Sequence, residues 1–137
     1  MTTTVFPTVS FADPRAGVAF LEAIGFTPVA LYWSESDPAL LDHGEFAWRG
    51  TGALMCGSAA REAPGAYERR VGTASIYCVV ATDADVDDVY ARALAAGATE
   101  ALAPADQDYG GRSATVRDAE GNQWSFGSYA GAAGASD

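Results

Sequence analysis

The sequence predicts an α+β fold in which two βαβββ modules form a single domain. The prediction comes from an internal repeat. A helix-like run over residues 13–25 returns 72 residues later over residues 85–97. A hairpin-like segment over residues 46–58 returns 70 residues later over residues 116–128. A repeat of this length is too long for a solenoid unit and too short for two independent domains, so it indicates two copies of one module.

The first module, about residues 3–58, begins with a strand and a capped helix. Residues 3–11 carry the apolar and aromatic side chains of a strand. Asp13 is a suitable N-cap, Pro14 fits the first helical position, and Gly25 can end the helix. The other predicted strands of this module are 27–33, 40–48 and 53–56, the last two joined by a tight turn.

A linker and a second module follow. Residues 59–72 are rich in Ala, Gly, Glu and Arg and predict a linker with at most one helical turn. The second module covers about residues 73–129. Asp83 or Asp85 is the expected N-cap of its helix. Its predicted strands are 73–81, 100–103, 112–117 and 123–129, and residues 130–137 are expected to form a frayed tail.

The composition limits the classes of ligand and the location that we expect for this protein. A chain of 137 residues with 49% apolar side chains can bury one normal core. The net charge of −10 argues against nucleic acid, whose phosphates would be repelled, and favours a neutral or cationic ligand. Plain acidic solubility is the simpler explanation of that charge. No apolar stretch could span a membrane and no export signal is visible, so we expect a cytoplasmic protein.

The stretch over residues 109–126 resembles the closing hairpin of the vicinal oxygen chelate superfamily, also called the glyoxalase/bleomycin resistance protein/dioxygenase family. That hairpin has an Asp-Pro-Asp/Glu-Gly-Asn turn, which here reads Asp118-Ala119-Glu120-Gly121-Asn122. A type I turn tolerates alanine in place of proline. The resemblance covers nearly the whole chain and implies paired βαβββ modules with a cup-like cleft.

Members of this family differ widely in function. They include metal-dependent lyases, isomerases, dioxygenases and thiol transferases, and also metal-free proteins that sequester antibiotics. The metal enzymes carry His or Glu on the first strand of each module and Glu on the last strand of the second. The corresponding residues here are Phe6, Pro7 and Thr8, then Ser75, Ile76 and Tyr77, and finally Ser125. None is a strong metal ligand, so we expect no metal and no cofactor.

No catalytic residue can be assigned from the sequence. His43 is the one histidine, and strand alternation places it on the same face as Glu45. It is an ordinary surface histidine, a fragment of a metal site, or a lone general base. Neither a nucleophile elbow nor a nucleotide-binding loop is present. Cys56 and Cys78 lack a metal-binding spacing and are expected to be small buried side chains.

Aromatic side chains supply the predicted ligand site. The expected ligand-binding residues are Phe6, Trp33, Trp48, Tyr109 and Arg112. Arg112 has the alternative of pairing with an acid of the fold itself. Trp124 is expected in the core, because Ser125 takes the ligand face of the same strand. A cleft of rigid aromatics suits a planar or apolar small molecule.

The sequence therefore predicts a metal-free binding protein of the bleomycin-resistance type, which sequesters a planar or aromatic ligand and so confers antibiotic resistance. The alternative is a glyoxalase-like or dioxygenase-like lyase or oxidoreductase of the same superfamily. The resemblance also implies a homodimer, because two-module members commonly complete their clefts across a two-fold interface.

Overall fold

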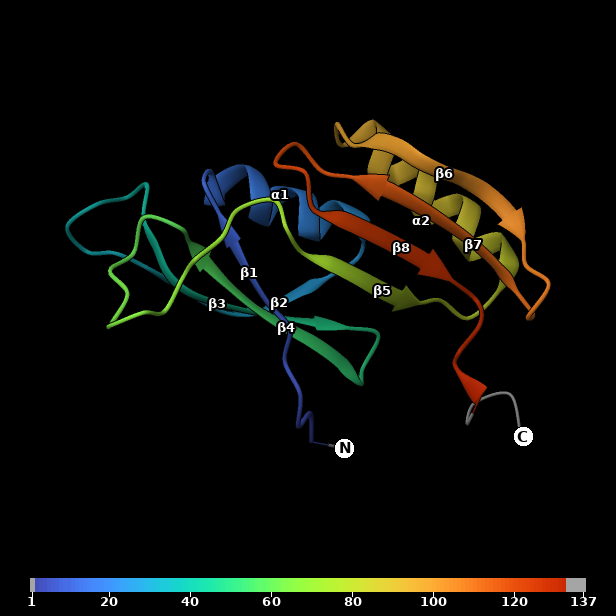
Figure 1. Ribbon diagram of the computed structural model, residues 1–137, viewed down its shortest axis with the longest axis horizontal. Coiled ribbons are helices and arrows are strands. Elements are labelled where there is room, and N and C mark those ends of the chain that lie inside the picture. Colours follow the sequence, from blue (N-terminus) through green and yellow to red (C-terminus); the bar gives the residue numbers. More distant parts are fainter. Residues whose placement is uncertain (1, 133–137) are drawn as a thin grey trace. The chain divides into compact units, whose positions relative to one another are not determined.

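The computed structural model describes residues 2–132 (Figure 1). The chain divides into two compact units, Met1–Ala74 (unit 1) and Ser75–Asp137 (unit 2). The elements of unit 1 are β1 (Thr8–Phe11), α1 (Pro14–Ile24), β2 (Thr27–Trp33), β3 (Leu41–Trp48) and β4 (Gly52–Ser58). Those of unit 2 are β5 (Ser75–Val79), α2 (Asp83–Ala95), β6 (Thr99–Asp106), β7 (Arg112–Arg117) and β8 (Gln123–Gly127). Each unit has the order βαβββ, which confirms the predicted α+β fold class.

The two sheets have the same topology. Their strand orders are β1-β4-β3-β2 and β5-β8-β7-β6. In each sheet the first strand of the unit pairs in parallel with the last, and the remaining pairs are antiparallel. The repeat in the sequence is therefore a repeat of strand order and of pairing direction.

Both helices are capped by side chains from the preceding residue. The Asp13 carboxylate accepts a hydrogen bond from the Ala16 amide at 3.2 Å, and Gly25 ends α1 with φ of 117°, as predicted. In α2 the cap differs from the prediction. Thr82 accepts from the Asp85 amide while the Asp85 carboxylate accepts from the Thr82 amide, so Asp85 closes a capping box from inside the helix.

One face of each sheet is buried beneath the helix of its own unit (Figure 1). The largest fully buried side chains of unit 1 are Val9, Phe11, Leu21, Ile24, Leu41, Phe46 and Leu54. Those of unit 2 are Val80, Val86, Val89, Trp124 and Phe126. Trp124 is fully buried, as predicted, and both cysteines are buried thiols outside any disulfide of the described residues. We call the sheet face turned away from the helix the open face, and it carries the alternate residues of each strand.

Several element bounds differ from the sequence prediction. The first strand covers Thr8–Phe11 and not residues 3–11, although the Met55 amide still donates to the Pro7 carbonyl at 3.0 Å. The strand predicted over residues 100–103 is longer, Thr99–Asp106, and contains two register shifts. The linker has turns but no helical turn, and Val71 forms an isolated bridge to Ser10. Of the predicted tail, residues 133–137 lie outside the described part of the chain.

Candidate ligand-binding site

The predicted tryptophan pair does not form one site. Trp33 lies at the end of β2, where it pairs with Leu41, and the Arg15 guanidinium lies 3.5 Å from its ring centroid. Trp48 lies on β3, seven residues beyond Leu41. At a rise of about 3.3 Å per residue, Trp48 is roughly 20 Å from Leu41 and from the Trp33 backbone that pairs with it. Trp48 is only 7% exposed, and its ring packs 4.8 Å from the Phe26 ring. It faces α1 and belongs to the core.

Phe6 lies before β1 and is half-buried. It lines neither of the two cavities described below. The sequence placed Phe6 on a longer first strand, and that strand is shorter than predicted. Phe6 is therefore not assigned to a ligand site with Trp33 or Trp48.

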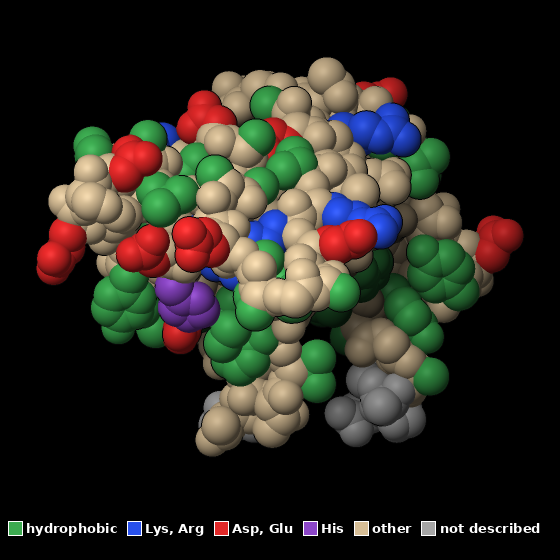
Figure 2. All heavy atoms as spheres, turned by 60° about the vertical axis from the view of Figure 1, so that its left-hand side comes forward, with side chains coloured by type: hydrophobic (Ala, Val, Ile, Leu, Met, Phe, Trp, Pro, Cys, Tyr) green, Lys and Arg blue, Asp and Glu red, His purple; other side chains and the backbone are tan. Residues whose placement is uncertain are grey.

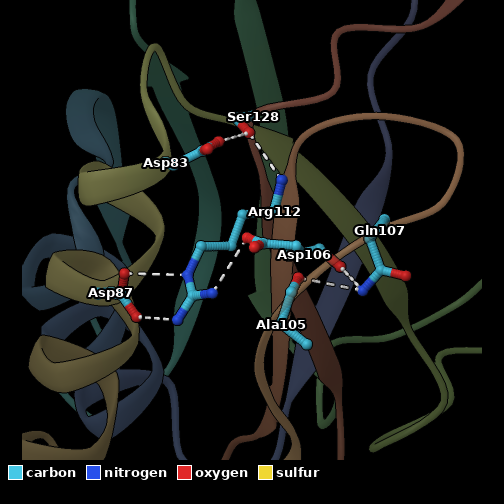
Figure 3. A network of polar contacts seen from close by, with 8 residues as sticks. Asp83, Asp87, Ala105, Asp106, Gln107, Arg112 and Ser128 are labelled. Atoms are coloured by element: carbon cyan, nitrogen blue, oxygen red, sulfur yellow. Dashed lines mark hydrogen bonds and ion pairs between the residues drawn. The ribbon is translucent and has the colours of Figure 1, made fainter.

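Arg112 pairs with acids of its own unit, which was the alternative considered from the sequence. Its Nε and Nη2 atoms each donate to an oxygen of Asp87 at 3.0 Å, and Nη1 donates to Asp106 Oδ1 at 3.2 Å (Figure 3). These bonds, that to Asp87 above all, raise the pKa of Arg112. Asp87 lies on α2 and Arg112 on β7, so these hydrogen bonds connect the helix to the sheet of unit 2.

Tyr109 belongs to a group of exposed aromatic side chains in unit 2. Its ring meets the Tyr129 ring edge-on, with centroids 5.2 Å apart, and the Tyr77 hydroxyl donates to the Tyr129 carbonyl at 2.9 Å. We call Tyr77, Tyr109 and Tyr129 the tyrosine cluster. Beside it lies an open cavity of about 380 Å³, lined by Tyr77, Val79, Tyr129, Ala130 and Gly131. Its lining is almost wholly apolar.

A glycine makes room for this cluster. A side chain at Gly127 on β8 would collide with the phenol of Tyr77, which lies across the glycine on the open face. Partial burial there, and secondly the neighbouring Tyr109, raise the pKa of Tyr77. The Tyr77 hydroxyl donates to the Tyr129 carbonyl, and the raised pKa keeps this donor protonated further into the alkaline range.

At the positions where the family resemblance implies metal ligands, the polar side chains are the hydroxyl groups of Thr8, Ser75, Tyr77 and Ser125. The Ser125 and Thr115 hydroxyls lie 2.7 Å apart and share a hydrogen bond. The Tyr77 hydroxyl donates its hydrogen bond to the Tyr129 carbonyl. Over residues 2–132, no three His, Cys, Asp or Glu side chains are close enough together to hold a metal ion. The prediction that the chain needs no metal remains a prediction.

His43 and Glu45 share the open face of unit 1, as strand alternation indicated. The His43 Nε2 atom lies 2.9 Å from Glu45 Oε2, and the Tyr32 ring stacks on the imidazole at 6.3 Å. Figure 2 shows the histidine side chain (purple) at the surface, with acidic side chains (red) close to it. This carboxylate–imidazole pair is the arrangement that a general base would use.

A second cavity, of about 160 Å³, lies on the open face of unit 1 beside His43. We call it the arginine pocket, because Arg61 and Arg69 line it together with Tyr67. The sequence reasoning treated these residues only as linker. A signal was present, since all eight basic residues of this chain are arginines and three of them fall within residues 59–72.

Comparison with known proteins bears on the fold and the family. The sequence model described as Glyoxalase/Bleomycin resistance protein/Dioxygenase superfamily matches residues 8–126. A search of curated proteins found no match.

Solved structures with the same fold include three that cover most of the chain. TioX from Micromonospora sp. ML1 has a TM-score of 0.71 and 23% identity, over 92% of this chain and 98% of its own. A glyoxalase-related enzyme from Fulvimarina pelagi has a TM-score of 0.68 and 20% identity, over 93% and 88%. Lactoylglutathione lyase from Agrobacterium tumefaciens has a TM-score of 0.63 and 20% identity, over 92% and 93%. At such identities the likeness extends to the fold alone.

Proposed function

Since the chain belongs to the Glyoxalase/Bleomycin resistance protein/Dioxygenase superfamily, we propose that it is a metal-free binding protein of the bleomycin-resistance type. It sequesters a planar or aromatic small molecule in the cytoplasm and leaves that molecule chemically unchanged. No helix in residues 2–132 is long and apolar enough to cross a membrane. The observation that carries the proposal is the tyrosine cluster with its adjoining apolar cavity.

The cavity has the size and lining that such a ligand needs. Its volume of about 380 Å³ falls at the lower end of the usual range for small-molecule sites, about 300–1,000 Å³. Tyr77 and Tyr109 are 45% and 58% exposed, so their rings are free to meet a ligand. Each aromatic contact contributes about 0.5–1.5 kcal/mol beyond the area it buries. The few polar groups around it would fix orientation and contribute little to the affinity.

The residues proposed to hold the ligand differ from those predicted by sequence alone. Tyr109 is retained, and Tyr77 and Tyr129 join it. Trp48 is withdrawn because it packs in the core, and Arg112 because its guanidinium is taken by Asp87 and Asp106. Trp33 stacks with Arg15 in the other unit, so it is assigned no part in this site.

The test is a calorimetric titration of purified protein with a panel of planar antibiotics, some of them cationic. Tyr77→Ala removes a ring from the cavity wall and should weaken binding of any positive compound by about tenfold or more, which corresponds to about 1.4 kcal/mol. Tyr32→Ala is the matched control, because Tyr32 is 60% exposed and lies in unit 1. The site is misassigned if Tyr77→Ala leaves binding unchanged, or if Tyr32→Ala weakens binding as much as Tyr77→Ala does.

A superfamily lyase or oxidoreductase is the second candidate, favoured by the His43–Glu45 pair next to a cavity. Mass spectrometry of each bound compound after long incubation separates the two functions. Unchanged compound supports sequestration. Conversion that His43→Gln abolishes supports an enzyme, and a requirement for added divalent metal would contradict the metal-free proposal.

A further inference from the structure

The arginine pocket presents two positively charged groups on a chain whose net charge is −10. It lies over β1 and β4 on the open face of unit 1, with the linker as its other wall. Its lining residues are Thr8, Val9, Ser10, His43, Met55, Cys56, Arg61, Tyr67 and Arg69. Figure 2 shows basic side chains (blue) near the histidine, partly covered by neighbouring atoms.

The two guanidiniums are held by neutral carbonyl groups. Arg61 donates from Nε to the Ser58 carbonyl at 2.7 Å and from Nη1 to the Asp42 carbonyl at 3.0 Å. Arg69 donates from Nη2 to the Glu62 carbonyl at 3.1 Å. Within residues 2–132, neither forms an ion pair with a carboxylate, whereas Arg70, Arg92 and Arg112 each do. Both charges in the pocket are therefore positioned without a direct ion pair, and the Asp42 carboxylate acts on Arg61 only as the smallest of several electrostatic influences.

Arg69 also has a donor that finds no acceptor. Its Nε atom is buried and makes no hydrogen bond within the described chain. Leaving a buried donor unpaired destabilises the fold, and the cost is larger for a charged group. Few such groups survive in folded proteins without a reason. A bound oxygen atom carrying negative charge would remove this cost.

The surroundings of Arg61 point in the same direction. A side chain at Gly57 would collide with the Arg61 guanidinium, so the absence of a β-carbon there lets the guanidinium lie against β4. Burial and secondly the charge of Arg69 lower the pKa of Arg61, as expected for two cations that line one cavity. Cys56 adds no negative charge, because burial raises its thiol pKa to about 11.

We propose that the arginine pocket binds the oxyanion group of a small molecule, a carboxylate or a phosphate, with Arg61 and Arg69 as its ligands. Guanidinium groups suit both anions because their N–H donors can form two parallel bonds. The hydroxyls of Thr8 and Ser10 are on the same cavity wall and offer further donors. This site lies in unit 1 and does not depend on the tyrosine cluster of unit 2.

The experiment uses sodium phosphate and sodium acetate as probes, with sodium chloride at equal ionic strength as the reference. Nuclear magnetic resonance of the arginine Nε–H groups reports the contact directly, and calorimetry gives the affinity. Phosphate or acetate, but not chloride, should shift the Arg69 Nε–H resonance. The stronger probe identifies the oxyanion. Arg69→Gln should weaken binding by about tenfold or more, the range expected for one charge-assisted contact.

Arg70→Gln is the matched control, because Arg70 is the next residue and pairs with Glu68 at the surface. It should leave the affinity unchanged. Gly57→Ala is a second variant that keeps every charge but displaces the Arg61 guanidinium, and it should weaken binding. The proposal is overturned if neither probe shifts the Arg69 resonance up to about 50 mM, well past millimolar affinity. It is equally overturned if Arg70→Gln weakens binding as much as Arg69→Gln.

Discussion

At the scale of single residues, the face of the strand decides what an aromatic side chain does. Trp48 is buried, whereas Trp33 is half-exposed and the Arg15 guanidinium lies over its ring. The two residue types are identical and their strands are neighbours, but their energetic roles differ. Trp48 stabilises the fold, and Trp33 contributes one cation–π contact at the surface.

We therefore expect Trp48→Ala to lower the free energy of unfolding by about 3–5 kcal/mol, because it removes a large buried ring and leaves a cavity. Trp33→Ala should cost far less, since the cation–π contact it loses contributes about 0.5–1 kcal/mol at an exposed site. Urea unfolding followed by circular dichroism measures both. A cost below about 1 kcal/mol for Trp48→Ala would contradict its place in the core.

The buried Cys56 thiol gives a prediction about pH. Burial raises its pKa from 9.0 to about 11, against a smaller opposite effect of Arg61. The unfolded chain loses this proton near pH 9 and the folded chain keeps it. The protonated thiol therefore makes its full contribution to the free energy of unfolding below pH 9. This contribution is lost as the pH rises through about 11.

Between those values the wild-type free energy of unfolding should fall by up to about 1.4 kcal/mol per pH unit more than that of Cys56→Ala. Urea titrations at several pH values give both slopes. Equal slopes for the two proteins would show that the thiol has no raised pKa.

At the scale of elements, the turn between β7 and β8 is organised by one carboxylate. Asp118 Oδ1 accepts from the amides of Glu120 and Asn122 at 2.9 and 3.0 Å. Asp118 Oδ2 accepts from Asn122 Nδ2 at 3.0 Å and from Trp124 Nε1 at 2.9 Å. The carboxylate therefore joins the turn to the buried tryptophan of the next strand.

We expect Asp118→Ala to destabilise the protein by about 2–4 kcal/mol, because hydrogen bonds to a charged group contribute about 1.5–3 kcal/mol each and do not add fully. Asp108→Ala is the control, since Asp108 is exposed in the preceding turn and should change stability by less than about 0.5 kcal/mol. Equal thermal midpoints for the two variants would remove this role from Asp118.

The sequence predicted the fold well because the fold depends on local signals that occur twice. Asp13, Pro14 and Gly25 set the ends of α1, and the turn at Asp118 sets the register of the last hairpin. The prediction was weaker where strand pairing or a hydrogen bond between two side chains and backbone amides decides the local structure. Residues 3–7 have strand composition but are not in a strand. Thr82 took the cap of α2 because Asp85 could bond back to it.

Prediction of the site was less successful, for a physical reason. The aromatic residues can be counted in a sequence, but the face of the sheet on which the Trp48 side chain lies depends on strand register. A register shift between Tyr32 and Trp33 changes the alternation along this hairpin. Arg61 and Arg69 come together through an irregular linker, which no periodic pattern describes. Tyr109 was chosen as an aromatic side chain at the expected cleft, and its part in ligand binding stays a prediction.

At the scale of the whole molecule, we predict a homodimer. The edge strands β2 and β6 carry exposed apolar side chains, with Val29 66% and Leu102 65% exposed. Exposed apolar groups on strand edges favour association with another chain. Light scattering at tens of micromolar should give about twice the chain mass of 14.1 kDa. Val29→Lys or Leu102→Lys should lower that mass, and a wild-type mass of 14.1 kDa would exclude the dimer.

The overall charge leads to a prediction about how the proposed aromatic ligand arrives. A net charge of −10 attracts cations over a distance set by salt, about 30 Å at 0.01 M and about 3 Å at 1 M ionic strength. A cationic planar compound should therefore associate about tenfold or more slowly at the higher salt, because steering is lost. A neutral compound with the same ring system is the control, and its association rate should change little. Stopped-flow fluorescence measures both rates. Equal salt dependence for the two compounds would show that the field of the protein does not select the ligand, and the preference would then have to come from contacts at Tyr77 and Tyr109 alone.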